Sequence, residues 1–200
     1  MVPPIDPVPV TLEGRHVRLE PLALRHLDGL CAVGLDAELW RWTGAEVATP
    51  ADMRDYVATA LAWQAQGSAL PFALVVPATG QVVGSTRYAN IDRVNRRLEI
   101  GWTWVARTAQ RTPVNTEAKY LLLRHAFEGL GCIRVEFKTD VLNERSRRAL
   151  LRIGAREEGV LRSHMITATG RVRDSVYFSI LVAEWPEVKA GLVEQLARPV

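Results

Sequence analysis

The feature that most constrains the fold is a strand-like run that leads through a short polar loop into a long helix-like run, between residues 98 and 127. The run "LEIGWTWV" is apolar and rich in tryptophan, and Pro113 lies in the loop that follows it. Asn115, Thr116 and Glu117 then open the helix. A helix start presents free backbone N–H groups and the positive end of the helix dipole. The segment therefore predicts a site for a phosphate or another anion, although an ordinary helix cap without a ligand fits the same residues.

Hydrophobic periodicity and turn residues predict alternating strands and helices around this segment. A helix start is predicted at Thr49, with Pro50 and Asp52 in its first turn, and a stop at Gly67. Strands are expected at 16–22, 70–77, 81–90, 96–105, 133–142, 154–166 and 172–181, and helices at 24–34, 50–66, 113–130, 144–153 and from 185 onward. The order predicts a central, largely antiparallel sheet of seven strands.

Length and composition indicate one globular domain. We expect an arm at 1–14, a single domain at 15–184 and a helical extension at 185–200. Cys31 and Cys132 are too few for a disulfide framework or a metal cluster, and no apolar run approaches the roughly 20 residues of a membrane span. With no visible secretion signal, a reduced, cytoplasmic setting is expected. The net charge of +3 is spread along the chain, which argues against nucleic acid but is compatible with a polyanionic small molecule.

Three stretches carry a resemblance to a known family: "LEGRHVRLEPL", "NTEAK" and "NERSRRALLRIGAREEGVLR". The chain resembles GNAT-superfamily N-acyltransferases, and among them the ribosomal-protein N-terminal acetyltransferases (RimJ/RimL-like). The resemblance implies an α/β (α+β) GNAT fold, with a mixed, mostly antiparallel sheet flanked by helices. It also implies direct transfer of an acyl group, most simply acetyl, from acetyl-CoA to a primary amine of a protein N-terminus, a lysine or a small molecule. No metal is implied, and a homodimer is left open.

The loop before the central helix departs from the pattern of this family. Relatives carry Gln/Arg-x-x-Gly-x-Gly/Ala around the pyrophosphate of coenzyme A, whereas Gln110 to Asn115 reads "QRTPVN" with neither glycine. Pro113 also removes one N–H that could face a phosphate. The residues that we expect to bind the cofactor are Trp104, Val105, Gln110, Arg111, Thr112, Val114, Asn115, Thr116, Lys119, Asn143 and Arg148.

Helical geometry separates two groups of charged residues on the central helix. Glu117, Arg124 and Glu128 are predicted to share one solvated stripe. Lys119 lies about 200° around the helix from Glu117, on an apolar side. It is predicted either to reach a phosphate or the substrate, or to extend its amine to water.

The strand at 97–105 carries the candidate general base. Strict alternation predicts one apolar face of Leu98, Ile100, Trp102 and Trp104, and a second face of Arg97, Glu99, Gly101, Thr103 and Val105. The resemblance implies that Glu99 takes a proton from the amine, which must be neutral to attack a thioester. A salt bridge to Arg97 or Arg87 is the alternative.

Ser146 is the candidate acid. With Ala149, Leu150 and Ile153 it forms the inward stripe of the helix after Asn143, while Arg145, Arg148 and Arg152 point outward. The resemblance places Ser146 near the cofactor sulfur, where it would protonate the leaving thiolate. Many relatives carry a tyrosine at the position of Leu150 for this purpose. Ser146 could equally be a small core residue, and Asn143 a simple helix cap.

Trp40, Arg87, Tyr88 and His164 are predicted to line the acceptor groove, and no metal-ligand spacing occurs. Two other functions stay open. One is a non-catalytic protein that binds acyl-CoA or a partner. The other is a succinyl-CoA-dependent transferase, in which Arg87 or Lys119 pairs with the distal carboxylate of the donor.

Overall fold

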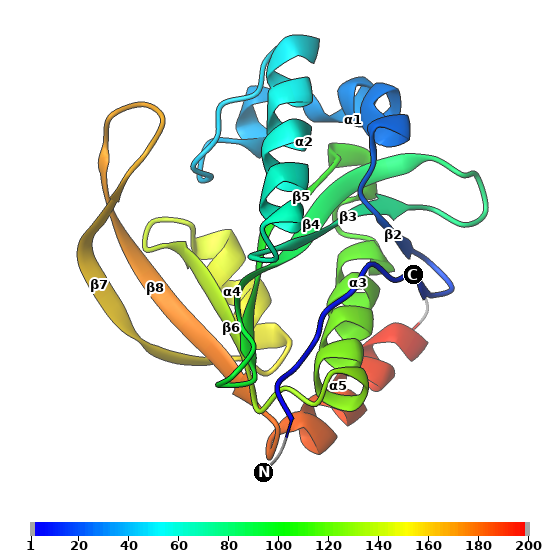
Figure 1. The fold of residues 1–200 in the computed structure, drawn as a ribbon, viewed down its shortest axis with the longest axis vertical. Helices are drawn as coiled ribbons and strands as arrows, with labels where there is room; N and C mark the ends of the chain where they lie inside the picture. The colour runs from blue at the N-terminus through cyan, green and yellow to red at the C-terminus, as the bar shows by residue number, and fades with distance from the viewer. Residues whose placement is uncertain (1–2, 199–200) are drawn as a thin grey trace.

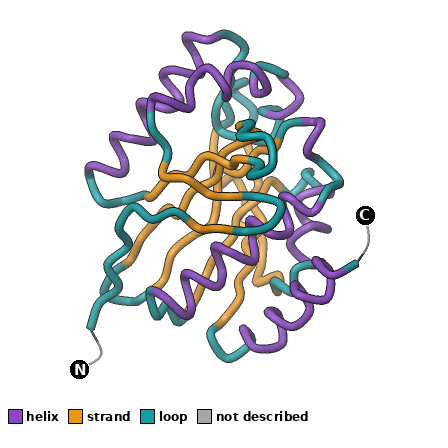
Figure 2. Tube along the Cα trace, turned by 90° about the vertical axis from the view of Figure 1, so that its right-hand side faces the viewer, coloured by secondary structure: helices purple, strands orange, loops and turns teal. Residues whose placement is uncertain are grey.

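The computed structural model describes residues 3–198, and its centre is a single sheet of eight strands in the order β1-β2-β3-β4-β5-β6-β8-β7. Figures 1 and 2 show this sheet between two groups of helices. The strands are β1 (Leu12–Glu13), β2 (Arg18–Pro21), β3 (Leu70–Val75), β4 (Val82–Asp92), β5 (Arg97–Val105), β6 (Arg134–Asp140), β7 (Arg156–Ile166) and β8 (Val172–Leu181). The helices are α1 (Leu27–Gly34), α2 (Pro50–Ala65), α3 (Pro113–Arg124), α4 (Glu144–Arg152) and α5 (Trp185–Ala197). Short helical turns lie at Leu24–His26, Ala37–Leu39, Arg107–Ala109 and His125–Gly129.

The mixed, mostly antiparallel sheet is confirmed, but the prediction of seven strands is wrong by one. The eighth strand, β1, lies within the predicted arm and pairs Leu12 with Leu19 of β2. Ile5 and Leu12 are both buried in the main core. A strand of two residues is too short to produce an alternating pattern, so β1 has no local signal in the sequence.

The strands β5 and β6 form the only parallel pair in the described sheet, and they separate early. Their register runs only from Arg97–Arg134 to Glu99–Glu136. Beyond Glu99, β5 continues beside β4 as far as Val105, and β6 continues beside β8 as far as Asp140. The carboxyl-terminal halves of β5 and β6 therefore enclose a wedge in the middle of the sheet, with the start of α3 close to the end of β5.

Helices lie on both faces of the sheet (Figure 1), and each face has its own hydrophobic core. One core packs α3 and α5 against the sheet through residues such as Leu98, Leu122 and Leu192. The other packs α1 and α2 against the opposite face through residues such as Leu30 and Val57. The capping prediction for α2 is confirmed, because Thr49 accepts from the Asp52 N–H and Asp52 accepts from the Thr49 N–H.

A bulge in β5 overturns the predicted faces of this strand. Trp102 has a φ of 49°, and the pairing with β4 shifts from Arg87–Gly101 to Ser85–Trp104. One extra residue reverses the alternation from that point on. Trp104 consequently packs in the α1/α2 core while Val105 packs in the α3/α5 core, the reverse of strict alternation.

The solvated stripe predicted on α3 is also wrong for Glu117. Its carboxylate is buried and accepts the backbone N–H groups of Arg15, His16 and Val17 at 2.9, 2.5 and 2.8 Å. A Cβ on Gly14 would come within 2.6 Å of the same carboxylate. Glu117 therefore fixes the turn before β2 onto α3, a contact between segments about a hundred residues apart that helical geometry alone cannot predict.

Candidate active site

Glu99 lies at the point where β5 and β6 begin to separate, on the sheet face that α2 covers. Its side chain is almost fully buried, with 2% of the residue exposed. Asn90 Nδ2 donates to Oε2 at 2.8 Å, and Lys138 Nζ lies 3.7 Å from the same oxygen. The other oxygen, Oε1, leans over Gly101, where a Cβ would come within 2.7 Å of it. A glycine at 101 therefore leaves the room that this carboxylate occupies.

The surroundings of Glu99 act on its pKa in opposite directions. Burial raises the pKa of Glu99 above its usual 4.5, and the nearby Lys138 ammonium and the Asn90 hydrogen bond act in the opposite direction. A carboxylate with a raised pKa holds a proton more firmly than an exposed one. The ion pair is made with Lys138 of β6, not with Arg97 or Arg87 as the alternative prediction had it.

Arg87 lies beside Glu99 on the same face, as a diagonal neighbour across the β4–β5 pair. Its guanidinium is buried among three aromatic rings, with its central carbon 4.9 Å from the ring centre of Tyr56, 5.2 Å from Trp63 and 5.3 Å from Trp102. Arg87 thus lies close to Glu99, but beneath aromatic side chains rather than along an open acceptor groove.

The far side of Glu99 is polar and comes from β6, β8 and β7. Lys138 lies between the rings of Trp102 and Tyr177, at 5.8 and 5.9 Å. His164 packs edge-on against Tyr177 and is within 3.1 Å of the Ser175 hydroxyl through Nδ1. Burial, followed by the charges of Lys138 and Arg173, lowers the pKa of His164. The predicted acceptor residue His164 therefore belongs to the same polar cluster as Glu99.

Two other predicted acceptor residues lie in the core instead. Trp40 is buried against Tyr56 and Trp104, and its indole donates to the Gly34 carbonyl. Tyr88 points to the α3 face, opposite to Arg87, and its hydroxyl donates to the Leu122 carbonyl at 2.6 Å. Alternation along β4 separates Tyr88 from the neighbouring Arg87, so the two could not line one groove.

The loop before α3 keeps a helix start without the glycines of its relatives. Arg111 is exposed and adopts the left-handed conformation, with a φ of 62°, that a glycine would adopt more easily. The Thr112 hydroxyl caps α3 by accepting from the Val114 N–H at 3.3 Å. Gln110 donates to the Val105 carbonyl and accepts from Arg145 of α4. The loop thus joins the end of β5 to both α3 and α4, around the wedge between β5 and β6.

Lys119, in the second turn of α3, points inward, away from any phosphate at the helix start. Lys119 Nζ donates to the Thr103 hydroxyl at 2.9 Å, which in turn lies 2.7 Å from the Thr86 hydroxyl. Nζ is also 5.8 Å from the ring centre of Phe137 on β6. Burial lowers the pKa of Lys119 to about 7. Its amine therefore borders the wedge on the α3 side. In the first turn of α3, Val114 and Thr116 are buried and Asn115 is half-buried.

On α4, the inward stripe holds Ser146 as predicted. Ser146 is half-buried, and its backbone N–H donates to Asn143 Oδ1 at 3.1 Å, so Asn143 is a helix cap. Leu150 and Ile153 are buried, and Arg148 is exposed with Glu144 3.7 Å away. The predicted cofactor residue Arg148 therefore lies on the outer surface of α4.

Sequence reasoning missed Asn90, Lys138 and Tyr177 in this cluster. Lys138 could have been noticed, because on β6 it lies on the face opposite to the buried residues Val135, Phe137 and Thr139. Its pairing with Glu99 depends on the parallel register of β5 and β6, for which the sequence carries no local signal.

Residues 16–156 match the family described as "Acetyltransferase (GNAT) domain". The chain belongs to the GNAT family. This GNAT domain is 39% identical over 106 residues to "Putative ribosomal N-acetyltransferase YdaF" of Bacillus subtilis, a match that spans 53% of this chain and 57% of that relative. It is 35% identical to a GCN5-related N-acetyltransferase from Brucella melitensis, with a TM-score of 0.90 over 98% of this chain and 90% of the other.

A second similar structure contains CoA-disulfide. The GNAT domain is 25% identical to Mycobacterium smegmatis RimJ in complex with CoA-disulfide, with a TM-score of 0.81 over 94% of this chain and 95% of the other. The predicted GNAT fold, the RimJ/RimL-like branch and the acyl-CoA-dependent N-acetyltransferase activity are thereby confirmed.

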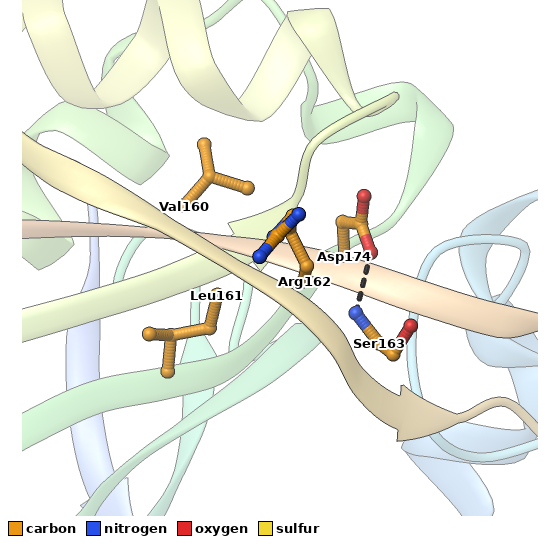
Figure 3. Close-up of a pocket in the computed structure, with 5 residues that line it drawn as sticks. All are labelled: Val160, Leu161, Arg162, Ser163 and Asp174. Atoms are coloured by element: carbon orange, nitrogen blue, oxygen red, sulfur yellow. Dashed lines mark hydrogen bonds between the residues drawn. The ribbon is translucent and has the colours of Figure 1, made fainter.

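Two cavities lie away from Glu99. One is an open groove of about 620 Å³ along β7 and β8. Figure 3 draws the residues that line it, Val160, Leu161, Arg162, Ser163 and Asp174. The other, of about 310 Å³, lies between the end of α4 and α5. Neither cavity is lined by a residue of the Glu99 cluster, so both are separate from the candidate active site. No helix between residues 3 and 198 is long and apolar enough to cross a membrane, and this range holds no group of metal-ligating side chains.

Proposed function

We propose that this enzyme transfers an acetyl group from acetyl-CoA to a primary amine, with the α-amine of a peptide or protein N-terminus as the preferred acceptor. Support for the acceptor comes from the similarity to the Bacillus subtilis relative that is named as a ribosomal N-acetyltransferase. Support for the donor comes from the CoA-disulfide bound to the similar RimJ structure.

The observation that carries the proposal is the buried carboxylate of Glu99 with one oxygen, Oε1, turned over Gly101. An amine that approaches from the α2 face meets Oε1, while Asn90 and Lys138 hold Oε2. Glu99 takes the ammonium proton, directly or through a water molecule. The neutral nitrogen then attacks the thioester carbonyl, and the C–S bond breaks as the amide forms.

The other parts of the site hold the donor. The helix start at 111–116 suits the pyrophosphate, because it combines the α3 dipole, free N–H groups and the exposed Arg111 guanidinium. The wedge between β5 and β6 suits the pantetheine arm, and a backbone N–H in the stretch 103–105, just after the bulge, would stabilise the oxyanion. Ser146, at the start of α4, returns a proton to the departing thiolate.

Glu99→Gln tests this role, because the amide keeps the shape of the side chain but cannot accept the proton. We expect kcat/KM to fall by about 10²- to 10⁴-fold in a thiol-release assay with a peptide acceptor. Acetyl-CoA affinity, measured by calorimetry, should be unchanged. Glu136→Gln is the matched control, since Glu136 faces Glu99 across the β5–β6 register, and it should retain activity within about twofold. Full turnover by Glu99→Gln at every pH would remove Glu99 from this role.

A further inference from the structure

The guanidinium of Arg87 is a buried cation that no acid of the described chain neutralises. Arg87 is 1% exposed, and none of the ion pairs within residues 3–198 includes it. Its Nε is buried without a hydrogen-bond acceptor. A buried arginine has five N–H donors in one plane, and donors without acceptors are costly in the interior of a protein. Arg87 therefore has hydrogen-bonding capacity that the protein itself does not use.

The aromatic rings around Arg87 hold the cation but leave its donors free. Tyr56, Trp63 and Trp102 all lie within about 5 Å of the guanidinium carbon, where ring faces attract a cation. Ring faces attract the charge but offer no oxygen acceptor, and no side-chain or carbonyl oxygen of the described residues accepts a hydrogen bond from Arg87 Nε. Trp63 and Trp102 are only half-buried, and they pack edge to face at 5.3 Å. The guanidinium thus lies one side chain below the surface, on the side from which the amine approaches Glu99.

Positive charge exceeds negative charge around Glu99 and Arg87. Lys138 is paired with Glu99, so Arg87 remains as an extra positive charge on this face. Arg173 and Arg171, further along β8, are both engaged with Asp140. An acceptor that is only a cation would meet net repulsion here, whereas one that also carries an anion would neutralise Arg87.

We propose that Arg87 binds a carboxylate that the acceptor carries close to its reacting amine. The acceptor class is then an amine with a neighbouring acid: either a free amino acid, or a peptide with an acidic residue at its N-terminus. Glu99 Oε1 receives the amine and Arg87 receives the carboxylate, on diagonal positions of the same sheet face. The inference rests on the proposed acetyl transfer to a primary amine and narrows its acceptor.

The first experiment measures kcat/KM with paired acceptors that differ only in the acid. Asp-Ala-Ala-amide is compared with Asn-Ala-Ala-amide, and alanine with alaninamide, which separates the two sources of the carboxylate. We expect at least one acid to exceed its neutral counterpart by about 10- to 100-fold, the range for hydrogen bonds to charged groups. In Arg87→Met that ratio should fall to about one, while Arg87→Lys, which keeps the charge but lacks the fork, should restore part of it.

Arg41→Met is the matched control, because Arg41 also lies over a tryptophan, Trp42 at 5.0 Å, but is exposed. It should leave the ratio unchanged. Thermal melting and the KM for acetyl-CoA verify that the Arg87 variants fold. Calorimetric binding of the same four acceptors gives a readout that does not depend on turnover.

Three results would overturn the inference. The first is equal use and equal binding of the acid and neutral acceptors by the unaltered enzyme, which leaves the transferase proposal intact. The second is an equal loss for both acceptors in Arg87→Met. The third is dependence on Arg87 of the KM for succinyl-CoA rather than for the acceptor, which would assign the carboxylate to the donor. Absence of turnover with every amine would refute the proposed function, and acid-selective binding lost in Arg87→Met would still support this site.

Discussion

Glu117 and Glu99 are both buried glutamates, on opposite faces of the same sheet, and they differ in how their oxygens are used. Glu117, on the α3 side, is 7% exposed and accepts three backbone N–H groups. Glu99, on the α2 side, is 2% exposed, accepts one amide and lies 3.7 Å from a lysine. Similar burial therefore accompanies different chemistry.

The difference distinguishes a structural acid from the proposed general base. Three backbone donors surround the Glu117 carboxylate and join the turn before β2 to α3. Glu99 keeps one oxygen over the open space of Gly101, and burial raises its pKa. A similar contrast holds for two of the buried basic residues: Lys119 donates to Thr103 within the fold, whereas Arg87 Nε has no hydrogen-bond acceptor.

The largest effect on stability is expected for Glu117→Gln. The amide would direct one N–H₂ group at backbone donors that now meet a carboxylate oxygen, so that buried N–H groups lose their acceptor. We expect the free energy of unfolding to fall by about 3 kcal/mol, measured by urea denaturation. The pH dependence of turnover in the folded fraction should not change. Glu194→Gln, at an exposed pair with Arg198, is the control and should change stability by less than about 0.5 kcal/mol. A loss no larger than that of the control would mean that the three hydrogen bonds contribute little.

Lys119→Met should act in the opposite direction, and its effect should depend on pH. The pKa of Lys119 is about 7 in the folded protein and 10.5 in its usual range, so between these values the unfolded chain binds more protons and stability rises with pH. Burial of the cation is thus most costly below pH 7. We expect Lys119→Met to gain about 2 kcal/mol at pH 6, with the gain shrinking towards pH 9.

Denaturation at the two pH values measures this change. Lys189→Met is the control, because Lys189 is exposed and paired with Glu128. This variant should not be stabilised at low pH. A stability change in Lys119→Met that is the same at pH 6 and pH 9 would contradict a titrating, buried Lys119.

The pH profile of activity sharpens the role of Glu99. The base must be ionised, so kcat/KM should fall as pH drops through a pKa above 4.5. Lys138 lowers that pKa, so Lys138→Met should raise it further and move the acidic limb to higher pH by up to about one unit, or about 1.4 kcal/mol. Lys189→Met should leave the limb in place. An acidic limb that does not move in Lys138→Met would separate the limb from Glu99.

Arg111→Gly separates the contribution of the backbone before α3 from that of the Arg111 side chain in the proposed binding of the pyrophosphate. The left-handed conformation of Arg111 disfavours any residue with a Cβ, so glycine should stabilise the fold by up to about 1 kcal/mol. Loss of the exposed guanidinium should nevertheless raise the KM for acetyl-CoA about threefold to tenfold, as expected for one charge contact with a phosphate. Arg152→Ala, on the outer stripe of α4, is the control. A lower KM in Arg111→Gly would mean that the loop conformation, not the charge, limits binding.

The parts that the sequence predicted are those with a local signal. Capping of α2 by Thr49 and Asp52, the inward stripe of α4 and most strands follow from turn residues and periodicity. The resemblance supplied the family, and with it Glu99 and Ser146. In contrast, the bulge at Trp102 shows no sequence mark, because a tryptophan there looks like one more member of an alternating run.

The parts that the sequence could not predict depend on register or on distant contacts. Glu117 meets residues 15–17 across the whole first half of the chain, and Lys138 meets Glu99 only because β5 and β6 are parallel. Arg87 and Tyr88 were predicted to share a groove although neighbours on a strand face opposite ways. Alternation would have corrected that last error, whereas the first two needed the fold.

The smallest effect is expected for Ser146→Ala, on the donor side of the site. A thiol with a pKa near 8.5 leaves readily as the thiolate, so a proton from Ser146 adds little to the rate. We expect kcat to fall about threefold, or about 0.7 kcal/mol in the barrier, with more of the loss at high pH than at low pH, because hydronium and buffer acids can protonate the thiolate in place of Ser146 at low pH. The Ser146 N–H still donates to the Asn143 side chain in this variant, so α4 should keep its stability. Ser163→Ala, in the groove along β7, is the control. A hundredfold or larger fall in kcat would mean that Ser146 contributes as much to the rate as is proposed for Glu99. No fall in kcat would mean that Ser146 is only a small residue that packs against the sheet.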